Sequence, residues 1–332
     1  MMKLVSRPYR RLLWIVGIGL ACLLPFQPWL YPVFLMELMC FGLFAAAFNL
    51  LIGYTGLLSF GHAAFFGVAG YVTGKACNNW ALTPELGMLC GVLASTLLGW
   101  LFGALAIRRQ GIYFAMITLA LAQMVYFVCV QLPQTGGEEG LIVPRGKLFG
   151  LVDLSSDVAM FYCVLTVFLA GMLLVWRVVH SPFGEMMKSV RDNEARAVSL
   201  GVNADRVKLL AFTLSAALTG LAGATKAIVF QLVTWTDVHW HTSGDVVVMS
   251  LLGGIGTTLG PWVGAAMVIG LQHYLADIGS WSPIVIGLVF VACVLSFRRG
   301  VVGEFIAALR WRSAPGTQRP GDDIQHSPTE VR

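Results

Sequence analysis

Residues 53–71 read GYTGLLSFGHAAFFGVAGY, an apolar stretch that contains five glycines, a serine and a histidine. A helix that only faced lipid would have no use for so many small residues. Small residues let helix backbones approach each other closely, and inside a membrane this packing replaces the hydrophobic effect. Gly67, Gly70 and Gly74 follow each other at near-helical spacing. The stretch therefore predicts a tightly packed helix in the interior of a membrane protein.

The composition of the whole chain also indicates a membrane protein. Of 332 residues, 57% are hydrophobic and only 12% are charged, and the mean hydropathy is +0.77. Soluble domains carry about 25% charged residues. The net charge is +5, but the basic residues lie between apolar segments, which is typical of an orientation signal and not of a nucleic-acid-binding surface.

We predict an all-α integral membrane protein with about eight transmembrane helices and one re-entrant helical hairpin. A span needs about 20 mostly apolar residues. The predicted spans are 12–30, 33–52, 57–75, 85–107, 111–131, 158–176, 208–231 and 281–297. Residues 245–277 are interrupted by GGIGTTLGP (253–261), which predicts two half-helices. Non-helical backbone at membrane depth must be enclosed by protein or line a cavity, so we expect this turn in the protein interior.

The distribution of lysine and arginine predicts the orientation. These residues prefer short cytoplasmic loops. Residues 1–11 and the loop 177–208 are rich in them and are predicted to be cytoplasmic, on either side of a transmembrane domain that covers 12–312. The tail 313–332 is rich in proline, glycine and charge, which predicts a disordered segment. Both termini are then cytoplasmic, and the hairpin enters and leaves on the outer side.

The cysteines and histidines do not predict a metal site. The seven cysteines are scattered through apolar segments without a CxxC pair, and we interpret them as small buried side chains. His239 and His241 lie near Asp237 and Asp245 and have the chemistry of metal ligands. Because they fall in a short outer loop, a surface role is the preferred interpretation.

A few polar side chains fall on the predicted spans. Such groups need partners at membrane depth and usually face the bundle interior or a water-filled path. Both helix packing and lining of a translocation path remain open for them. The candidates for the path are Asn49, Ser59, His62, Thr118 and Gln123, together with Gly254 and Gly256 of the interrupted segment.

Ser59 and His62 also resemble, faintly, the serine and base of an intramembrane hydrolase. A base of this kind has to be oriented by a third group. The sequence places neither an acid nor a second histidine to orient His62. The segment GYVTGKA (70–76) is one residue short of a P-loop and has no serine or threonine after its lysine. We therefore expect no enzymatic activity in this chain.

The segment SPFGEMMKSVRDNEARAVSLGVNADRVK (181–208) predicts an amphipathic helix at the cytoplasmic surface. Ser181 followed by Pro182 is typical of a helix start, and Gly201 of a helix end. Apolar residues recur between them at helical spacing. The helix is either an interfacial anchor or a docking site for a cytoplasmic protein. Asp192 and Glu194, which alternate with basic residues, favour a protein partner over anionic lipid.

Five blocks in the same order resemble the permease family of branched-chain amino acid ABC importers, and the LivM-type subunit more than the LivH-type. The resemblance extends from about residue 40 to 305. The blocks are GYTGLLSFGHAAFFGVAGY (53–71), GIYFAMITLALAQ (111–123), TGGEEGL (135–141), SPFGEMMKSVRDNEARAVSLGV (181–202) and LLGGIGTTLGPWVGAA (251–266).

The resemblance implies an assembly in a bacterial inner membrane. A LivH-like chain would form the path with this one, two cytoplasmic ATPase subunits would bind ATP and Mg²⁺, and a periplasmic protein would deliver the substrate. This chain would bind lipid but no cofactor and no nucleic acid. The loop resembles the EAA-type coupling loop, although its glutamate–glycine distance is one residue longer and an arginine follows Ala195. The predicted ATPase contacts are Phe183, Arg191, Glu194, Ala195 and Gly201.

For function, the resemblance implies translocation of branched-chain or related amino acids. Permeases of this kind also carry urea or short amides, and the residues do not separate these substrates. A stand-alone secondary carrier would need ionisable groups at mid-span, which are scarce here. An intramembrane hydrolase is the remaining alternative.

Overall fold

The computed structural model describes residues 31–80, 82–137, 139–148, 152–275, 281–296 and 300–304. The predicted first span (12–30), the N-terminal segment 1–11 and the tail 313–332 lie outside them. The helices are α2 (Pro32–Thr55), α3 (His62–Asn79), α4 (Pro84–Ala106), α5 (Ile112–Gln131), α6 (Asp157–Val179), α7 (Pro182–Asp192), α8 (Glu194–Ser199), α9 (Ala204–Phe230), α10 (Trp240–Gly253), α11 (Gly260–Leu275) and α12 (Ser282–Ser296).

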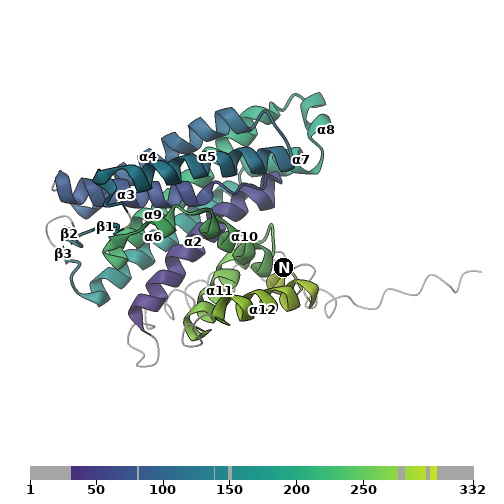
Figure 1. Ribbon diagram of the computed structural model, residues 1–332. Coiled ribbons are helices and arrows are strands. Elements are labelled where there is room, and N and C mark those ends of the chain that lie inside the picture. Colours follow the sequence, from purple (N-terminus) through teal and green to yellow (C-terminus); the bar gives the residue numbers. More distant parts are fainter. Residues whose placement is uncertain are drawn as a thin grey trace, which may run out of the picture.

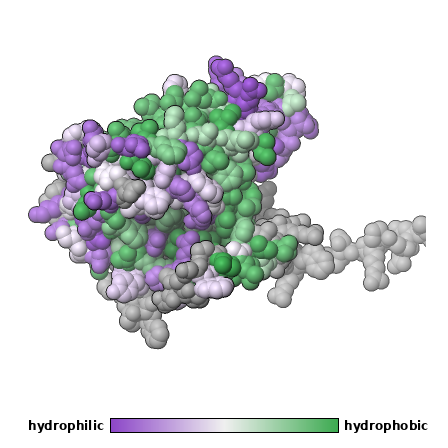
Figure 2. Space-filling model, in the orientation of Figure 1, coloured by the Kyte–Doolittle hydropathy of each residue, from purple (hydrophilic) through white to green (hydrophobic). Residues whose placement is uncertain are grey.

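Among the described residues, five helices are long and apolar enough to cross a membrane: α2, α4, α5, α6 and α9. They coincide within a few residues with five of the predicted spans. Figure 1 shows most of the long helices side by side, with the short strands at one end of the bundle and α7 and α8 at the other. Figure 2 shows that both ends are hydrophilic and that the surface between them is mostly hydrophobic. This pattern is that of a multi-pass membrane protein.

The structure divides the stretch 53–71 between two helices, which corrects the predicted span 57–75. Gly56 ends α2 with a φ of +75°, a conformation that glycine adopts readily, and α3 begins only at His62. The glycines of α3 bring it against neighbouring backbone and side chains. A Cβ atom added at Gly67, for example, would lie 2.2 Å from Val238 Cγ2. The small residues of this stretch therefore serve both a turn and close helix packing.

Helix α4 carries a stripe of small residues that sequence inspection overlooked. Gly87, Gly91, Ser95, Gly99 and Gly103 recur every four residues and are all buried. A Cβ atom at Gly91 would lie 2.5 Å from Ala69 O of α3, and one at Gly99 would lie 2.3 Å from Ala216 Cβ of α9. The stripe seats α4 in the groove between α3 and α9, since residues at this spacing share one helix face.

The interrupted segment forms a hairpin, as predicted. Helices α10 and α11 are joined by residues 254–259, and their backbones approach so closely that a Cβ atom at Gly264 would lie 1.8 Å from Met249 O. His273, near the end of α11, packs against Phe34 at the start of α2 with ring centroids 5.0 Å apart. The turn, in contrast, contacts the last turns of α2. The hairpin thus extends along most of α2 and is deeper than a shallow re-entrant loop.

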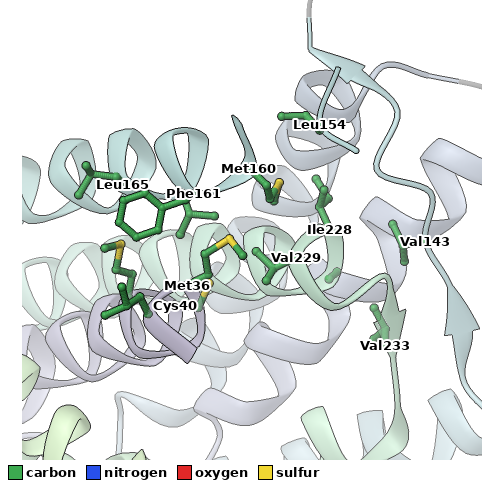
Figure 3. Packing of buried hydrophobic residues seen from close by; sticks show 14 of the residues in the cluster. Met36, Cys40, Val143, Leu154, Met160, Phe161, Leu165, Ile228, Val229 and Val233 are labelled. Carbon is green, nitrogen blue, oxygen red and sulfur yellow. The ribbon is translucent and has the colours of Figure 1, made fainter. Parts of the chain in front are cut away.

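Four short strands form a cap at the end of the bundle opposite α7 and α8. Strand β1 (Leu141–Ile142) pairs with β4 (Leu232–Val233), and β2 (Lys147–Leu148) pairs with β3 (Val152–Asp153). Figure 3 shows the packing beneath the cap, where side chains of α2, α6 and α9 meet those of the strands and loops. The apolar core therefore continues from the bundle into the cap.

Candidate functional site

The segment predicted as one amphipathic helix is two helices that meet at Asn193. Ser181 starts α7 as predicted, because its side chain accepts a hydrogen bond from the N–H of Gly184. Asn193 then ends α7 in extended backbone, with φ at −160°, and its Oδ1 accepts from the N–H of Arg196 to begin α8. Asparagine is a strong helix N-cap, which explains the break. Gly201 follows α8 with a φ of +89°.

We name residues 182–201, which comprise α7, Asn193, α8 and the two residues after α8, the platform. One side of it packs on the bundle through Met187, Val190 and Ala197, which are buried with residues of α2, α6 and α9. Phe183 is partly buried against the same cluster. The other side is exposed and mixes both charges with apolar side chains. Its exposed members include Glu185, Met186, Asp192, Ala195, Arg196, Val198, Leu200 and Gly201.

Glu194 is anchored to the bundle by two hydrogen bonds. Its Oε1 accepts from Lys208 Nζ over 2.6 Å, and its Oε2 accepts from Gln110 Nε2 over 2.8 Å. The Lys208 side chain is only 4% exposed, so the pair largely neutralises a buried cation. Glu194 therefore fixes the start of α8 to α9 and to the loop between α4 and α5.

Arg191 reaches inward from the last turn of α7. Its Nη1 donates to Gly53 O over 2.5 Å, near the end of α2. Its Nε and Nη2 both donate to Asp192 Oδ1, over 3.1 and 2.9 Å. The carbonyl of Gly53 belongs to the last turn of α2, where carbonyls lack partners within the helix. Arg191 satisfies one of them.

Asn49 holds the turn of the hairpin with both ends of its amide. Nδ2 donates to Thr257 O over 2.8 Å, and Oδ1 accepts from Gly256 N over 2.9 Å. The hydroxyl of Tyr54 donates to Gly256 O over 3.0 Å. Gly254 and Gly256 adopt positive φ, 113° and 77°, which allows the sharp turn. Three of the predicted path residues, Asn49, Gly254 and Gly256, thus meet at one place.

His62 lies in a separate, fully buried site between α2, α3 and α9. Its Nε2 is 2.9 Å from Ser215 Oγ, and Ser215 in turn donates to Ala47 O over 2.6 Å. The edges of three aromatic rings enclose the imidazole: Phe48, Phe65 and Phe212. His62 Nε2 is bonded to the Ser215 hydroxyl, whereas the Ser59 hydroxyl accepts from Gly61 N, so the Ser59–His62 side-chain pair of the hydrolase alternative is not formed.

Ser59 and Thr118 organise the connection between α2 and α3. The N–H of Gly61 donates to Ser59 Oγ over 3.2 Å, and the N–H of Phe60 donates to Thr118 Oγ1 over 3.3 Å. Both side chains are fully buried. Gln123 lies five residues further along α5, about one and a half turns toward the cap, and is partly exposed at the helix surface. The predicted path residues therefore fall into four separate places.

Several residues of these sites escaped sequence inspection. Lys208, Gln110, Tyr54 and Ser215 each complete a bond to a predicted residue. Lys208 carried a usable signal, since a lysine in the first turns of an apolar helix needs a partner if it is buried. Tyr54 and Ser215 carried none, because their partners are more than 150 positions distant in the sequence.

Comparison with known proteins agrees with the fold. Residues 33–294 match the family described as branched-chain amino acid transport system, permease component. The high-affinity branched-chain amino acid transport permease LivM of Salmonella typhimurium is 26% identical over 284 residues, which cover 76% of this chain and 65% of that protein. This chain thus covers slightly less than two thirds of the length of this relative. No solved structure is significantly similar.

Two further relatives mark the breadth of the family. The probable LivM of Methanocaldococcus jannaschii is 24% identical over 307 residues, covering 79% of this chain and 87% of that protein. The autoinducer 2 import permease LsrC of Salmonella paratyphi B is 28% identical over 238 residues, covering 68% and 63%. The family match covers most of the chain and the apolar helices are those of a membrane protein. The chain therefore belongs to the permease family of branched-chain amino acid transport systems.

Proposed function

We propose that this chain is the transmembrane permease subunit of an ABC importer that moves branched-chain or related amino acids across a bacterial inner membrane. The observation that carries the proposal is the platform. It is anchored on the ends of α2, α6 and α9, yet presents a face of mixed charge and exposed apolar residues such as Val198 and Leu200. Such a face suits a protein partner, and a cytoplasmic ATPase is the partner that an importer needs.

The orientation follows from charge. Arg108, Arg109, Arg177 and Arg206 all lie near the platform end of the bundle. Because basic loops stay in the cytoplasm, the platform faces the cytoplasm and the strand cap faces the periplasm. A periplasmic substrate-binding protein would dock on the cap. Both terminal segments, which lie outside the described residues, are proposed to be cytoplasmic.

The path is proposed to form between two permease chains. The gap beside Met39, Leu43 and Phe168 has no room for a water molecule, whereas small-molecule sites usually measure about 300–1,000 Å³. Described helices pack closely along their small-residue faces. A LivH-like second chain, or a second copy of this one, would complete a path along an outer surface of the bundle, with lipid covering the rest.

The proposed work of this chain is a conformational change, and ATP and Mg²⁺ are bound by the two ATPase subunits. Their closure would move the platform, and the bundle would change between two packings. A ligand or partner can shift such an equilibrium only through different contacts with the two states. Phe183, Arg191, Glu194, Ala195 and Gly201 are the proposed coupling residues. Urea and short amides remain the alternative substrates of the same mechanism.

Uptake in a deletion strain tests the substrate. Cells that express this chain with its ATPase, second permease and substrate-binding subunits should accumulate labelled leucine or another amino acid in an ATP-dependent manner. Competition with urea and short amides would rank the alternatives. Accumulation that persists without any ATPase subunit would contradict the importer and favour a stand-alone carrier.

Site-specific crosslinking tests the platform. A crosslinker on Ala195→Cys or Gly201→Cys, both exposed positions, should capture an ATPase subunit in intact cells. The same reagent on Glu139→Cys, an exposed position in the cap, is the matched control and should not. Equal capture from both ends of the molecule would contradict the assignment of the platform.

A further inference from the structure

The carbonyl of Gly53 is the point where the platform, α2 and the hairpin meet. Arg191 Nη1 donates to it from the platform side. Gly256, in the hairpin turn, lies against it from the other side: a Cβ atom added at Gly256 would be 3.5 Å from Gly53 O and 3.9 Å from Arg191 Nη1. Conversely, a Cβ atom at Gly53 would be 2.7 Å from Gly256 N. Only glycine fits at position 53 without moving the turn.

The hairpin turn is held at this point by side chains of α2. Asn49 contributes two hydrogen bonds and Tyr54 one, all to backbone atoms of Gly256 or Thr257. Asn49 is 2% exposed, so its bonds are shielded from exchange with water. The turn therefore follows the end of α2, and the end of α2 is tied to α7 by Arg191.

Helices α10 and α11 pack so closely that we expect them to move together with the turn that joins them. The backbones of α10 and α11 are in direct contact, since a Cβ atom at Gly253 would lie 1.8 Å from Gly260 O. A Cβ atom at Gly264 would meet Met249 O at the same distance. Two helices packed without intervening side chains have little freedom to slide past each other. A displacement at residues 254–259 is therefore passed on along both helices.

Arginine has the geometry that this junction requires. Its guanidinium offers donors on separate edges, so that Asp192 occupies Nε and Nη2 while Nη1 remains directed at Gly53 O. Asp192 is 67% exposed on the platform. A lysine could reach one of these two acceptors but has no planar fork to hold both.

We propose that Arg191 is a positioning residue that passes movement of the platform to the α10–α11 hairpin through the carbonyl of Gly53. The proposal rests on the proposed function, in which an ATPase moves the platform. It changes the role of two predicted path residues: Asn49 and Gly256 belong to the transmission between platform and hairpin. The hairpin is then the part of this chain that moves with the ATP cycle.

The test measures transport per ATP in the complete complex of permeases, ATPases and binding protein, reconstituted in lipid. Arg191→Lys should copurify with the ATPases and hydrolyse ATP at a near-normal rate. Its substrate uptake per ATP should fall about five- to tenfold, within the usual range of coupling between sites. Arg206→Lys, at an exposed position on α9 outside the platform, is the matched control and should leave the ratio unchanged. An unchanged ratio in Arg191→Lys would overturn the proposal.

A second variant guards against a simple docking defect. Gly53→Ala leaves the exposed face of the platform intact but pushes against Gly256 N, so it should lower uptake per ATP in the same way. If Arg191→Lys no longer copurifies with the ATPases, Gly53→Ala becomes the test of the proposal. A normal substrate uptake per ATP in Gly53→Ala would then overturn it.

Hydrogen exchange separates this inference from the proposed function. If the wild-type complex transports no tested substrate, the proposed function has failed, while the junction can still be measured in the purified chain. Amides of residues 254–259 should then exchange faster in Arg191→Lys than in the wild type or in Arg206→Lys. Equal exchange in all three proteins would overturn the proposal.

Discussion

The N–H of Gly256 donates a hydrogen bond to Asn49 Oδ1 over 2.9 Å, joining residues 207 positions apart in the chain. The same Asn49 side chain donates to Thr257 O over 2.8 Å. Both partners are backbone atoms in a turn where neither helix can satisfy them. The hairpin therefore depends on a side chain from a helix at the other end of the sequence.

Replacing Asn49 by leucine should destabilise the protein. Leucine keeps the branching of asparagine at Cγ but leaves Gly256 N and Thr257 O without this partner, and an unsatisfied buried group costs about 1–3 kcal/mol. The unfolding temperature of the purified chain in detergent should fall accordingly. Asn78→Leu is the control, because the Asn78 amide bonds Ile142 O at an exposed position where water can replace it. Equal losses in the two variants would contradict the role of Asn49.

Gly91→Ala should separate α4 from α3. The new methyl group would lie 2.3 Å from Thr73 Oγ1 and 2.5 Å from Ala69 O, so the backbone has to move. Overpacking of this kind costs about 1–3 kcal/mol. Gly270→Ala in α11 is the matched control: no atom lies within 4 Å of its Cβ position, and the change should be neutral or stabilising. Thermal unfolding in detergent compares the two, and a stable Gly91→Ala would show that α4 is not seated by its glycines.

Glu194→Gln should weaken the seating of α8. Lys208 would keep a neutral partner at a position where its side chain is 4% exposed. We expect a loss of about 1–3 kcal/mol, less than for a fully buried pair, because the Glu194 side chain is 30% exposed and solvent screens it. Glu185→Gln removes an exposed pair with Lys188 and should cost only about 0.2–0.5 kcal/mol. A double-mutant cycle with Lys208→Met measures the pair directly, and a coupling near zero would contradict this account.

Acidification should loosen the first turn of α10. His239 caps this helix, with its Nδ1 accepting from the N–H of His241, and a proton on Nδ1 removes that acceptor. Partial burial, and then the charge of His241, hold the pKa of His239 below its ordinary value near 6.5. Between the two pKa values the unfolded chain binds more protons, so stability is complete at higher pH and declines as the pH falls below about 6.5.

Hydrogen exchange at residues 241–244 checks this expectation, with rates corrected for the intrinsic effect of pH. His241 and Tyr126 are the other titratable side chains whose rings lie beside His239. His239→Asn retains a cap oxygen without a titrating group, so its protection should be the same at pH 7.5 and 5.5. A wild-type protein with equal protection at both values would rule out the His239 effect.

Much of the architecture could be predicted from sequence because membrane spans are long and their signals are strong. The start of α7 at Ser181 and the hairpin break near Gly254 carried local signals that the structure confirms. The break at Asn193 carried one as well, in the pair Asp192–Asn193, but the apolar spacing on either side suggested a continuous helix. Similarly, the positive φ of Gly56 explains why the predicted span 57–75 began too early.

The partners of polar residues could not be predicted in the same way. The sequence indicates that Asn49 and His62 need partners at membrane depth, but it does not show that these are Gly256 and Ser215. Those pairings depend on how α2, α3, α9 and the hairpin come together in space. The small-residue stripe of α4 could be predicted in part. Its spacing of four residues can be found in the sequence, but the sequence does not show that α3 and α9 pack against it.

Helix α9 carries a largely buried lysine near each end. Lys208 pairs with Glu194 at the platform, and Lys226 pairs with Asp237 beneath the cap over 2.7 Å. The two lysines are 18 residues apart, which is about five complete helical turns and roughly 27 Å along the axis. They therefore project from the same side, and rotating α9 about its own axis would strain both ion pairs together. Because its azimuth is fixed at both ends, α9 can rotate only together with the platform at one end and with the segment that carries Asp237 at the other.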